Sequence, residues 1–131
     1  MPYNVNAVVT ETFTFNDFIF TMNVSGAVTM ADLRKAVTLD KTAPNTVKLA
    51  GDGDEVYGRI ETFETGGLDG LTVGAISRKF RTTLPKTAPA IAVGDVVIGA
   101  GGGLVKKNAA AGAFGNTVIE VRDNSVVVEK L

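Results

Sequence analysis

The chain contains no cysteine, no histidine and no tryptophan among its 131 residues. Without cysteine it can form no disulfide, no thiolate nucleophile and no sulfur-ligated metal site. Without histidine it lacks the commonest general base and the commonest metal ligand, and every nucleophile that depends on a neighbouring imidazole is excluded. Catalysis would have to rely on carboxylates, lysine, tyrosine or a cofactor.

The chain also lacks an excess of charge of either sign and any long apolar run. Thirteen Lys and Arg oppose fourteen Asp and Glu, which gives a formal net charge of -1. This balance is not the electropositive footprint that holds nucleic acid or an anionic membrane, so we expect neither partner. No stretch approaches the ~20 apolar residues that span a bilayer, and "MPYNVNAVV" has no basic region ahead of an apolar run. The sequence predicts a soluble chain without a secretory signal.

Short runs rich in β-branched residues fill most of the chain, and Gly, Pro, Asn or Asp separates them. They are 35–40, 46–51, 55–65, 71–85, 93–99, 103–107, 116–122 and 125–131. Strands this short, without long helices between them, indicate an antiparallel sheet closed or stacked on itself. We expect one turn of helix at most within 25–37, where Thr29 could cap and Asp32 could lie in the first turn. The expected fold is all-β: a small antiparallel β-barrel or β-sandwich over residues 31–131, with an N-terminal β-hairpin or extended arm over residues 1–30.

The N-terminal segment differs in charge from the rest of the chain, because the charged side chains before Arg34 are Glu11, Asp17 and Asp32. Within it, "TETFTFNDFIFTMNV" alternates polar and apolar residues on both sides of Asn16-Asp17, which predicts a β-hairpin with these two residues as its turn. Directly opposed residues share a face, so four phenylalanines and a methionine would line one side of the hairpin. These candidate partner-binding residues are Phe13, Phe15, Phe18, Phe20 and Met22.

Two interpretations of this aromatic face remain open. The phenylalanines could cover the domain's own core. Alternatively, the hairpin could be an arm that packs on a neighbouring subunit, because an isolated hairpin is marginally stable and must bury its apolar face somewhere.

The stretch "VGDVVIGAGGGLVKKN", residues 93–108, has the glycine content of a phosphate-binding loop but not its spacing. A dinucleotide fingerprint needs glycine at positions one, three and six before a helix. Counting from Gly99 or from Gly101, the sixth position is Leu104 or Lys106, and a strand-like sequence follows. No glycine directly precedes a lysine followed by Ser or Thr, so the P-loop pattern fails as well. The stretch predicts a hairpin with a glycine turn between two buried strands.

Two other kinds of site fit the sequence poorly. "DGDE" at 52–55 resembles the start of a calcium loop, but Val56 and Phe63 occupy positions that need oxygen ligands. A biotinyl or lipoyl carrier would need a lysine at a hairpin tip, whereas Lys106 and Lys107 fall inside the returning strand. We therefore expect no cofactor and no metal site.

Paired carboxylates for glycoside cleavage are the remaining enzymatic option. The acids lie mainly beside turns or alternate with apolar residues, as in "IETFE" and "VIEVR", which is typical of solvated strand faces. With two tyrosines and no tryptophan, the chain has little from which to build a sugar-stacking platform. We expect the protein to have no enzymatic activity, no catalytic residue and no small-molecule substrate.

The order of these features resembles one known group of proteins. "DLRKAVTLDKTAPNTVKLAGDGDEVYGRIETFE", followed by "LTVGAISRKF" and "VGDVVIGAGGGLVKK", looks like the small decoration or cement proteins that tailed bacteriophages place on their capsids. The resemblance covers roughly residues 31–107. It implies a β-rich, non-enzymatic virion protein that binds the major capsid protein on the outer surface of the head, self-associates as a trimer or dimer, and stabilises the head.

The composition fits an adhesive structural part, because contact area needs apolar side chains and few buried charges. Strand addition from the N-terminal segment would add backbone hydrogen bonds to such a contact. The alternative is a β-rich binding module of another assembly, such as a phage head fibre, tail or baseplate component or a surface adhesin.

Overall fold

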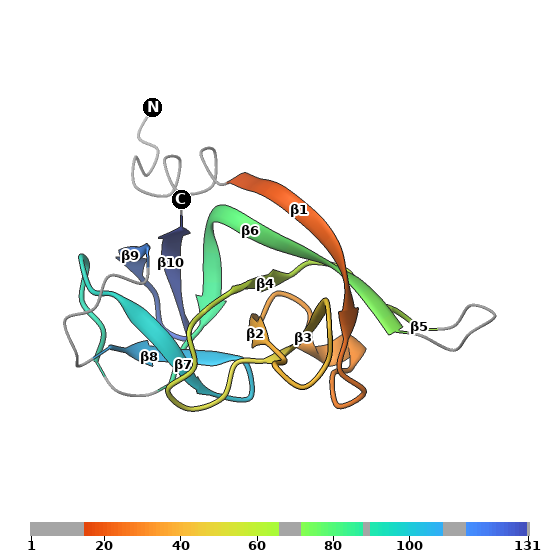
Figure 1. The fold of residues 1–131 in the computed structure, drawn as a ribbon. Coiled ribbons are helices and arrows are strands. Elements are labelled where there is room, and N and C mark those ends of the chain that lie inside the picture. The colour runs from red at the N-terminus through yellow and green to blue at the C-terminus, as the bar shows by residue number, and fades with distance from the viewer. Residues whose placement is uncertain (1–14, 66–71, 88–89, 109–114, 131) are drawn as a thin grey trace.

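The structure is a computed structural model that describes residues 15–65, 72–87, 90–108 and 115–130. These residues form ten strands and one short 3-10 helix (Figure 1). The elements are β1 Phe15–Val24, η1 Met30–Asp32, β2 Ala36–Leu39, β3 Thr46–Leu49, β4 Gly58–Ile60, β5 Glu64–Thr65, β6 Thr72–Pro85, β7 Val97–Gly101, β8 Leu104–Lys107, β9 Asn116–Val121 and β10 Ser125–Lys130. The predicted all-β fold is confirmed.

Five strands close into a barrel. Hydrogen-bonded neighbours run β1-β3-β2-β4-β6, and β6 pairs back with β1 to complete the ring. One pairing departs from the antiparallel expectation, because β1 runs parallel to β3 through Asn23↔Thr46 and Val24↔Val47. The barrel interior is apolar, since closing a sheet turns one face of every strand inward. Its buried residues are Met22, Val24, Val28, Val37, Val47, Ile60 and Ile76.

Strand β6 is the longest element and belongs to two layers of the molecule. One of its edges pairs with β1 from Val73 to Arg81, and the other pairs in turn with β5, β4 and β10. Beyond the barrel, β6, β10 and β9 form a ribbon that packs with the β7–β8 hairpin (Figure 1). This second core contains Ala36, Ala50, Val56, Phe80, Leu84, Ile91, Val97, Val105, Val118, Val126 and Val128.

The predicted glycine hairpin is confirmed. Strands β7 and β8 pair antiparallel, with a bulge between Gly99 and Gly101. Gly101, Gly102 and Gly103 have φ values of 105°, 60° and 81°, a region that side chains with a Cβ rarely adopt. The glycines therefore make the tight turn, and the stretch belongs to the fold.

The backbone groups on the outer edge of β7 are hydrogen-bonded by a side chain and by a loop. The side-chain amide of Asn116 acts as a strand: Val97 N donates to its Oδ1 at 2.9 Å, and its Nδ2 donates to Val97 O at 3.1 Å. Two residues further on, Gly99 N donates to Asp54 O at 2.7 Å and Gly53 N donates to Gly99 O at 2.9 Å. These bonds satisfy buried backbone groups and fasten the hairpin to the rest of the domain.

The predicted N-terminal hairpin is wrong. From Phe15 to Val24 the chain is one continuous strand, and Asn16 and Asp17 pair with Phe80 and Lys79 of β6 instead of forming a turn. The physical reason is that the 14-residue β6 offers a full-length pairing edge, so β1 needs no partner strand of its own. Residues 1–14 lie outside the described part of the chain, so the division into an arm over 1–30 and a domain over 31–131 stays a prediction.

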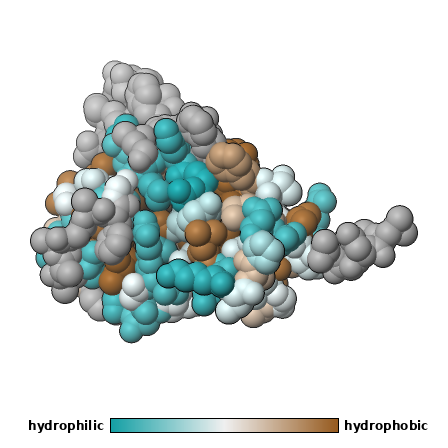
Figure 2. Space-filling view, viewed as in Figure 1, coloured by the Kyte–Doolittle hydropathy of each residue, from teal (hydrophilic) through white to brown (hydrophobic). Residues whose placement is uncertain are grey.

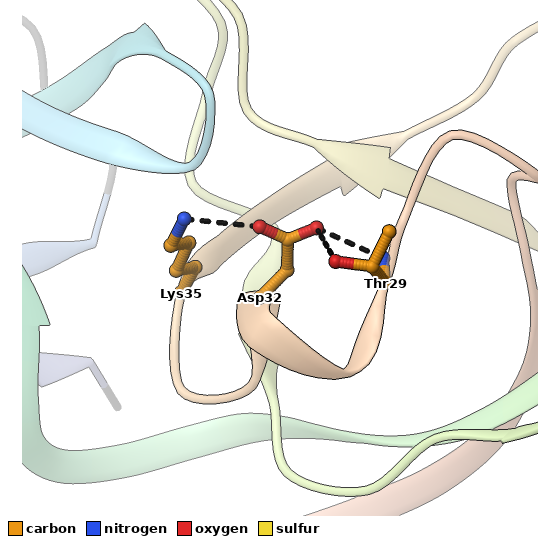
Figure 3. A network of polar contacts seen from close by, with 3 residues as sticks. All are labelled: Thr29, Asp32 and Lys35. Atoms are coloured by element: carbon orange, nitrogen blue, oxygen red, sulfur yellow. Dashed lines mark hydrogen bonds and ion pairs between the residues drawn. The ribbon is translucent and has the colours of Figure 1, made fainter.

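The expected single helical turn is present and has the predicted cap. Asp32 Oδ2 accepts from Thr29 N at 2.9 Å and from Thr29 Oγ1 at 3.2 Å, while Lys35 Nζ donates to Asp32 Oδ1 at 3.0 Å (Figure 3). The side chain of Asp32 is 13% exposed. The Thr29 backbone bond is the main reason why the pKa of Asp32 lies below its usual value, with Lys35 adding to the effect.

This cap predicts an acid-sensitive contribution to stability. A lowered folded-state pKa stabilises the protein above the unfolded-state value of about 3.9, and the contribution is lost as pH falls through the folded pKa. Asp32→Asn should therefore reduce the free energy of unfolding near pH 7 by about 1 kcal/mol and flatten its decline below pH 4. Urea denaturation between pH 2 and 7 measures the loss at neutral pH and the acid decline, with Asp123→Asn in the exposed β9–β10 turn as control. An unchanged acid decline in Asp32→Asn would contradict the assignment.

Candidate partner-binding surface

Strand β1 presents apolar side chains to solvent next to an open backbone edge. Ile19 and Phe20 are each 52% exposed, and because neighbouring strand residues point to opposite faces, both faces of β1 carry an apolar group here. One edge of β1 pairs with β6 along its length, whereas β3 pairs with the other edge only at Asn23 and Val24. From Phe15 to Met22, no strand in the described part of the chain occupies that second edge.

The structure describes two of the predicted partner-binding side chains and places them in different surroundings. Phe20 is exposed as expected, but Met22 is 5% exposed and lies in the barrel core, so it is not available to a partner. Phe15 lies at the start of β1 with Phe18 three residues further on, and Phe13 lies outside the described residues. The expected pairing of Phe15 with Phe18 is wrong, because Phe15 pairs with Arg81.

Sequence reasoning missed Ile19, which is not among the predicted partner-binding residues. The signal that could have found it was the unbroken run Phe18-Ile19-Phe20, which is apolar at consecutive positions and therefore on both faces of a strand. Other exposed large apolar residues lie singly, on different elements: Met30, Leu39, Val93 and Val121. On the face shown in Figure 2, hydrophobic residues form small groups among hydrophilic ones. Among the described residues, Ile19 and Phe20 are the exposed large apolar residues that are adjacent in sequence.

The two hairpin lysines pair with acidic side chains, and one of these lies in the acidic turn. Asp54 Oδ2 accepts from Gly51 N at 2.9 Å, which makes 51–54 a side-chain-stabilised turn. Lys106 forms an ion pair with Asp52, and Lys107 Nζ lies 3.8 Å from Asp95 Oδ1. Both lysines lie in β8, away from the hairpin tip that a carrier domain would use. These charges are part of the hairpin's attachment.

A shallow groove of about 460 Å³ runs between the end of the β2–β3 hairpin and the loop before β4. Asp40 in its wall is already engaged: its Oδ1 accepts from Thr42 N at 3.0 Å, and this pairing with Thr42 holds the pKa of Asp40 below its usual value. Leu39 and Tyr57 supply its larger apolar surfaces. The full lining is Thr38, Leu39, Asp40, Lys41, Thr42, Lys48, Gly53, Asp54, Glu55 and Tyr57.

A buried ion pair between Arg59 of β4 and the adjacent Glu61 is hydrogen-bonded to β6. Arg59, with a side chain 7% exposed, places Nε 3.1 Å from Glu61 Oε1, and Ser77 Oγ donates to the same oxygen at 3.0 Å. Arg59 Nη1 also donates to Thr83 O at 3.1 Å. Burial lowers the pKa of Arg59, and Glu61 opposes that shift. Glu61 was expected on a solvated strand face, and its 16% exposed side chain shows that this expectation was wrong.

A second set of cations lies where β6 meets β10. The guanidinium of Arg78 sits 3.6 Å from the centre of the Tyr57 ring and donates from Nη1 to the Tyr57 carbonyl. Lys130, at the end of β10, is 9% exposed and pairs across the strands with Phe80. Burial lowers the pKa of Lys130, and the charge of Arg78 lowers it further.

Within the described ranges, no group of three or more acidic side chains comes close enough to hold a metal ion. Among the same residues, no helix is long and apolar enough to cross a membrane. No family model, curated protein or solved structure matches this chain.

Proposed function

We propose that the protein is a non-enzymatic capsid decoration subunit, which binds the major capsid protein on the outer surface of a tailed-phage head and stabilises the assembled shell. The observation that carries the proposal is the β1 surface: Ile19 and Phe20 are half exposed, beside a strand edge left open from Phe15 to Met22 by the described part of the chain. An open edge with flanking apolar side chains is a template for strand addition by another chain.

The chemistry of the rest of the chain supports the same role. The carboxylates of Asp52 and Asp54 in the acidic turn are engaged by a lysine and a backbone amide, and the glycine-rich stretch is a structural hairpin. Binding through β1 would use backbone hydrogen bonds for affinity and the two apolar side chains for register. Self-association as a trimer or dimer on the capsid lattice is part of the proposal, because several weak contacts made at once raise the overall affinity for the capsid.

The test is co-sedimentation with expanded, undecorated heads of the phage that encodes the chain. Wild-type protein should bind saturably and stoichiometrically. The double variant Ile19→Thr with Phe20→Ser should lose about thirtyfold or more in affinity, since each apolar anchor at an interface contributes roughly 1–2 kcal/mol.

Val93→Ser is the matched control, because Val93 is 67% exposed on a different part of the surface. Circular dichroism and urea midpoints establish that each variant is folded. Absence of wild-type binding across micromolar concentrations would sink the proposal. Equal binding by the double variant would exclude the β1 surface.

A further inference from the structure

Lys130 is a buried cation with no paired counter-charge among the described residues. The residue is 9% exposed, and among the described residues its amino group forms no hydrogen bond and no ion pair. Glu55 is the acid whose field reaches it, and no ion pair joins the two. Placing an unpaired ammonium in a largely desolvated position costs stability, so such a group persists where something outside the domain offsets the cost. The amino group of Lys130 keeps an opening to solvent.

Arg78 lies beside Lys130 by the register of the sheet. Lys130 pairs directly with Phe80, so Arg78, two residues earlier on β6, is its diagonal neighbour on the same face. Diagonal neighbours in an antiparallel pair lie about 7–8 Å apart, a span that one carboxylate can bridge. In agreement, Arg78 is the strongest of the charges that act on Lys130.

The guanidinium of Arg78 is already oriented. Its plane is held against the Tyr57 ring, and Nη1 is tied to the Tyr57 carbonyl. The Nε and Nη2 side of the fork has no acceptor in the described part of the chain. That side presents two parallel N–H groups, which is the geometry that binds a carboxylate through both of its oxygens.

We propose that Arg78 and Lys130 form a binding site for a carboxylate, and that its occupant is an aspartate or glutamate side chain of the protein on which this domain docks. Arg78 binds both oxygens through Nε and Nη2, and Lys130 supplies the second positive charge. Lys79 adds to the positive field, whereas Glu55 opposes it. The identity of the docking partner rests on the proposed function, but the site itself does not.

The site can be tested first without any partner. Titration of the protein with sodium acetate, followed by NMR of the Arg78 Nε–H and Lys130 Nζ resonances, should give saturable shifts that sodium chloride at equal ionic strength does not produce. Lys130→Met keeps the length and apolar stem of the side chain, and it should weaken acetate binding about tenfold while leaving the urea midpoint unchanged or higher. Shifts with acetate no larger than those with chloride would overturn the site.

The partner is tested by the capsid co-sedimentation assay. Lys130→Met should bind capsids about tenfold more weakly than wild type, whereas Lys41→Met, which removes the same charge from an exposed turn, should bind as wild type does. Wild-type binding by Lys130→Met would mean that the amino group merely reaches solvent from the edge of the core, and would overturn the partner assignment. If wild-type protein binds acetate but no capsid, the proposed function fails and the carboxylate site stands.

Discussion

Gly99→Ala is expected to lower the free energy of unfolding by roughly 3–5 kcal/mol. A Cβ at this position would lie 2.2 Å from Gly51 O and 3.1 Å from Ala50 Cβ. Backbone atoms line the contact, so no side-chain rotation can relieve it. Either the β7–β8 hairpin or the 50–54 turn must move, and the paired bonds of Gly99 with Gly53 and Asp54 are lost with the movement.

Urea denaturation of wild type, Gly99→Ala and Gly26→Ala measures this effect. Gly26 lies in an exposed turn, and nothing lies within 4 Å of the position that an added methyl group would take, so its substitution should change stability by less than about 1 kcal/mol. Hydrogen exchange adds a local readout, since the amides of Gly53 and Gly99 should lose protection together in Gly99→Ala. A loss below about 1 kcal/mol would show that the hairpin can shift at little cost.

Arg59→Ala is the second substitution with a large expected effect, about 3–5 kcal/mol. Removing the guanidinium leaves Glu61 as a largely buried carboxylate without its counter-charge, and it removes a donor from Thr83 O. The loss of stability arises mainly from the unpaired carboxylate of Glu61. The attraction between the two ions contributes little net stability, because the desolvation of both ions offsets it. The double variant Arg59→Met with Glu61→Gln should therefore recover most of the loss.

Thermal and urea denaturation of Arg59→Met, Glu61→Gln and the double variant form the required cycle, and Arg59→Ala is measured beside them. Arg122→Ala is the comparison for a more exposed pair: Arg122 and Glu120 are 33% and 32% exposed, and this loss should stay below about 1 kcal/mol. If the double variant were as unstable as Arg59→Ala, the hydrogen bonds of Arg59 would matter more than the charge balance.

Local chemistry made most of the fold predictable. Glycine, proline and asparagine mark the strand ends, so the strands containing 46–49, 72–85 and 125–130 were all expected close to where they lie. The Thr29 and Asp32 cap was visible for the same reason, because its residues are three positions apart. These features depend on neighbours in sequence, and a single sequence displays them directly.

Features that depend on distant segments were not predictable. Asn16-Asp17 has good turn chemistry, yet pairing with β6 some sixty residues later overrides it. The parallel pairing of β1 with β3 closes the barrel and leaves no local signature. Arg59 and Lys130 are buried, although the alternation of polar and apolar residues in their strands does not predict this. Their burial depends on packing against strands that are distant in sequence. Of the predicted partner-binding residues, the proposed β1 surface keeps Phe20, adds Ile19 and leaves out the buried Met22.

The sharing of β6 has a consequence for how the molecule comes apart. Ile76 fills the barrel, whereas Phe80 and Leu84, a few residues further along the same strand, fill the second core. Neither core can open while keeping its own strands, because detaching β6 from one exposes the other. The domain should thus unfold as a single cooperative unit, without a half-folded state in which one core survives. For a subunit that resists a load applied at β1, whose main pairing partner is β6, both cores would resist that load together.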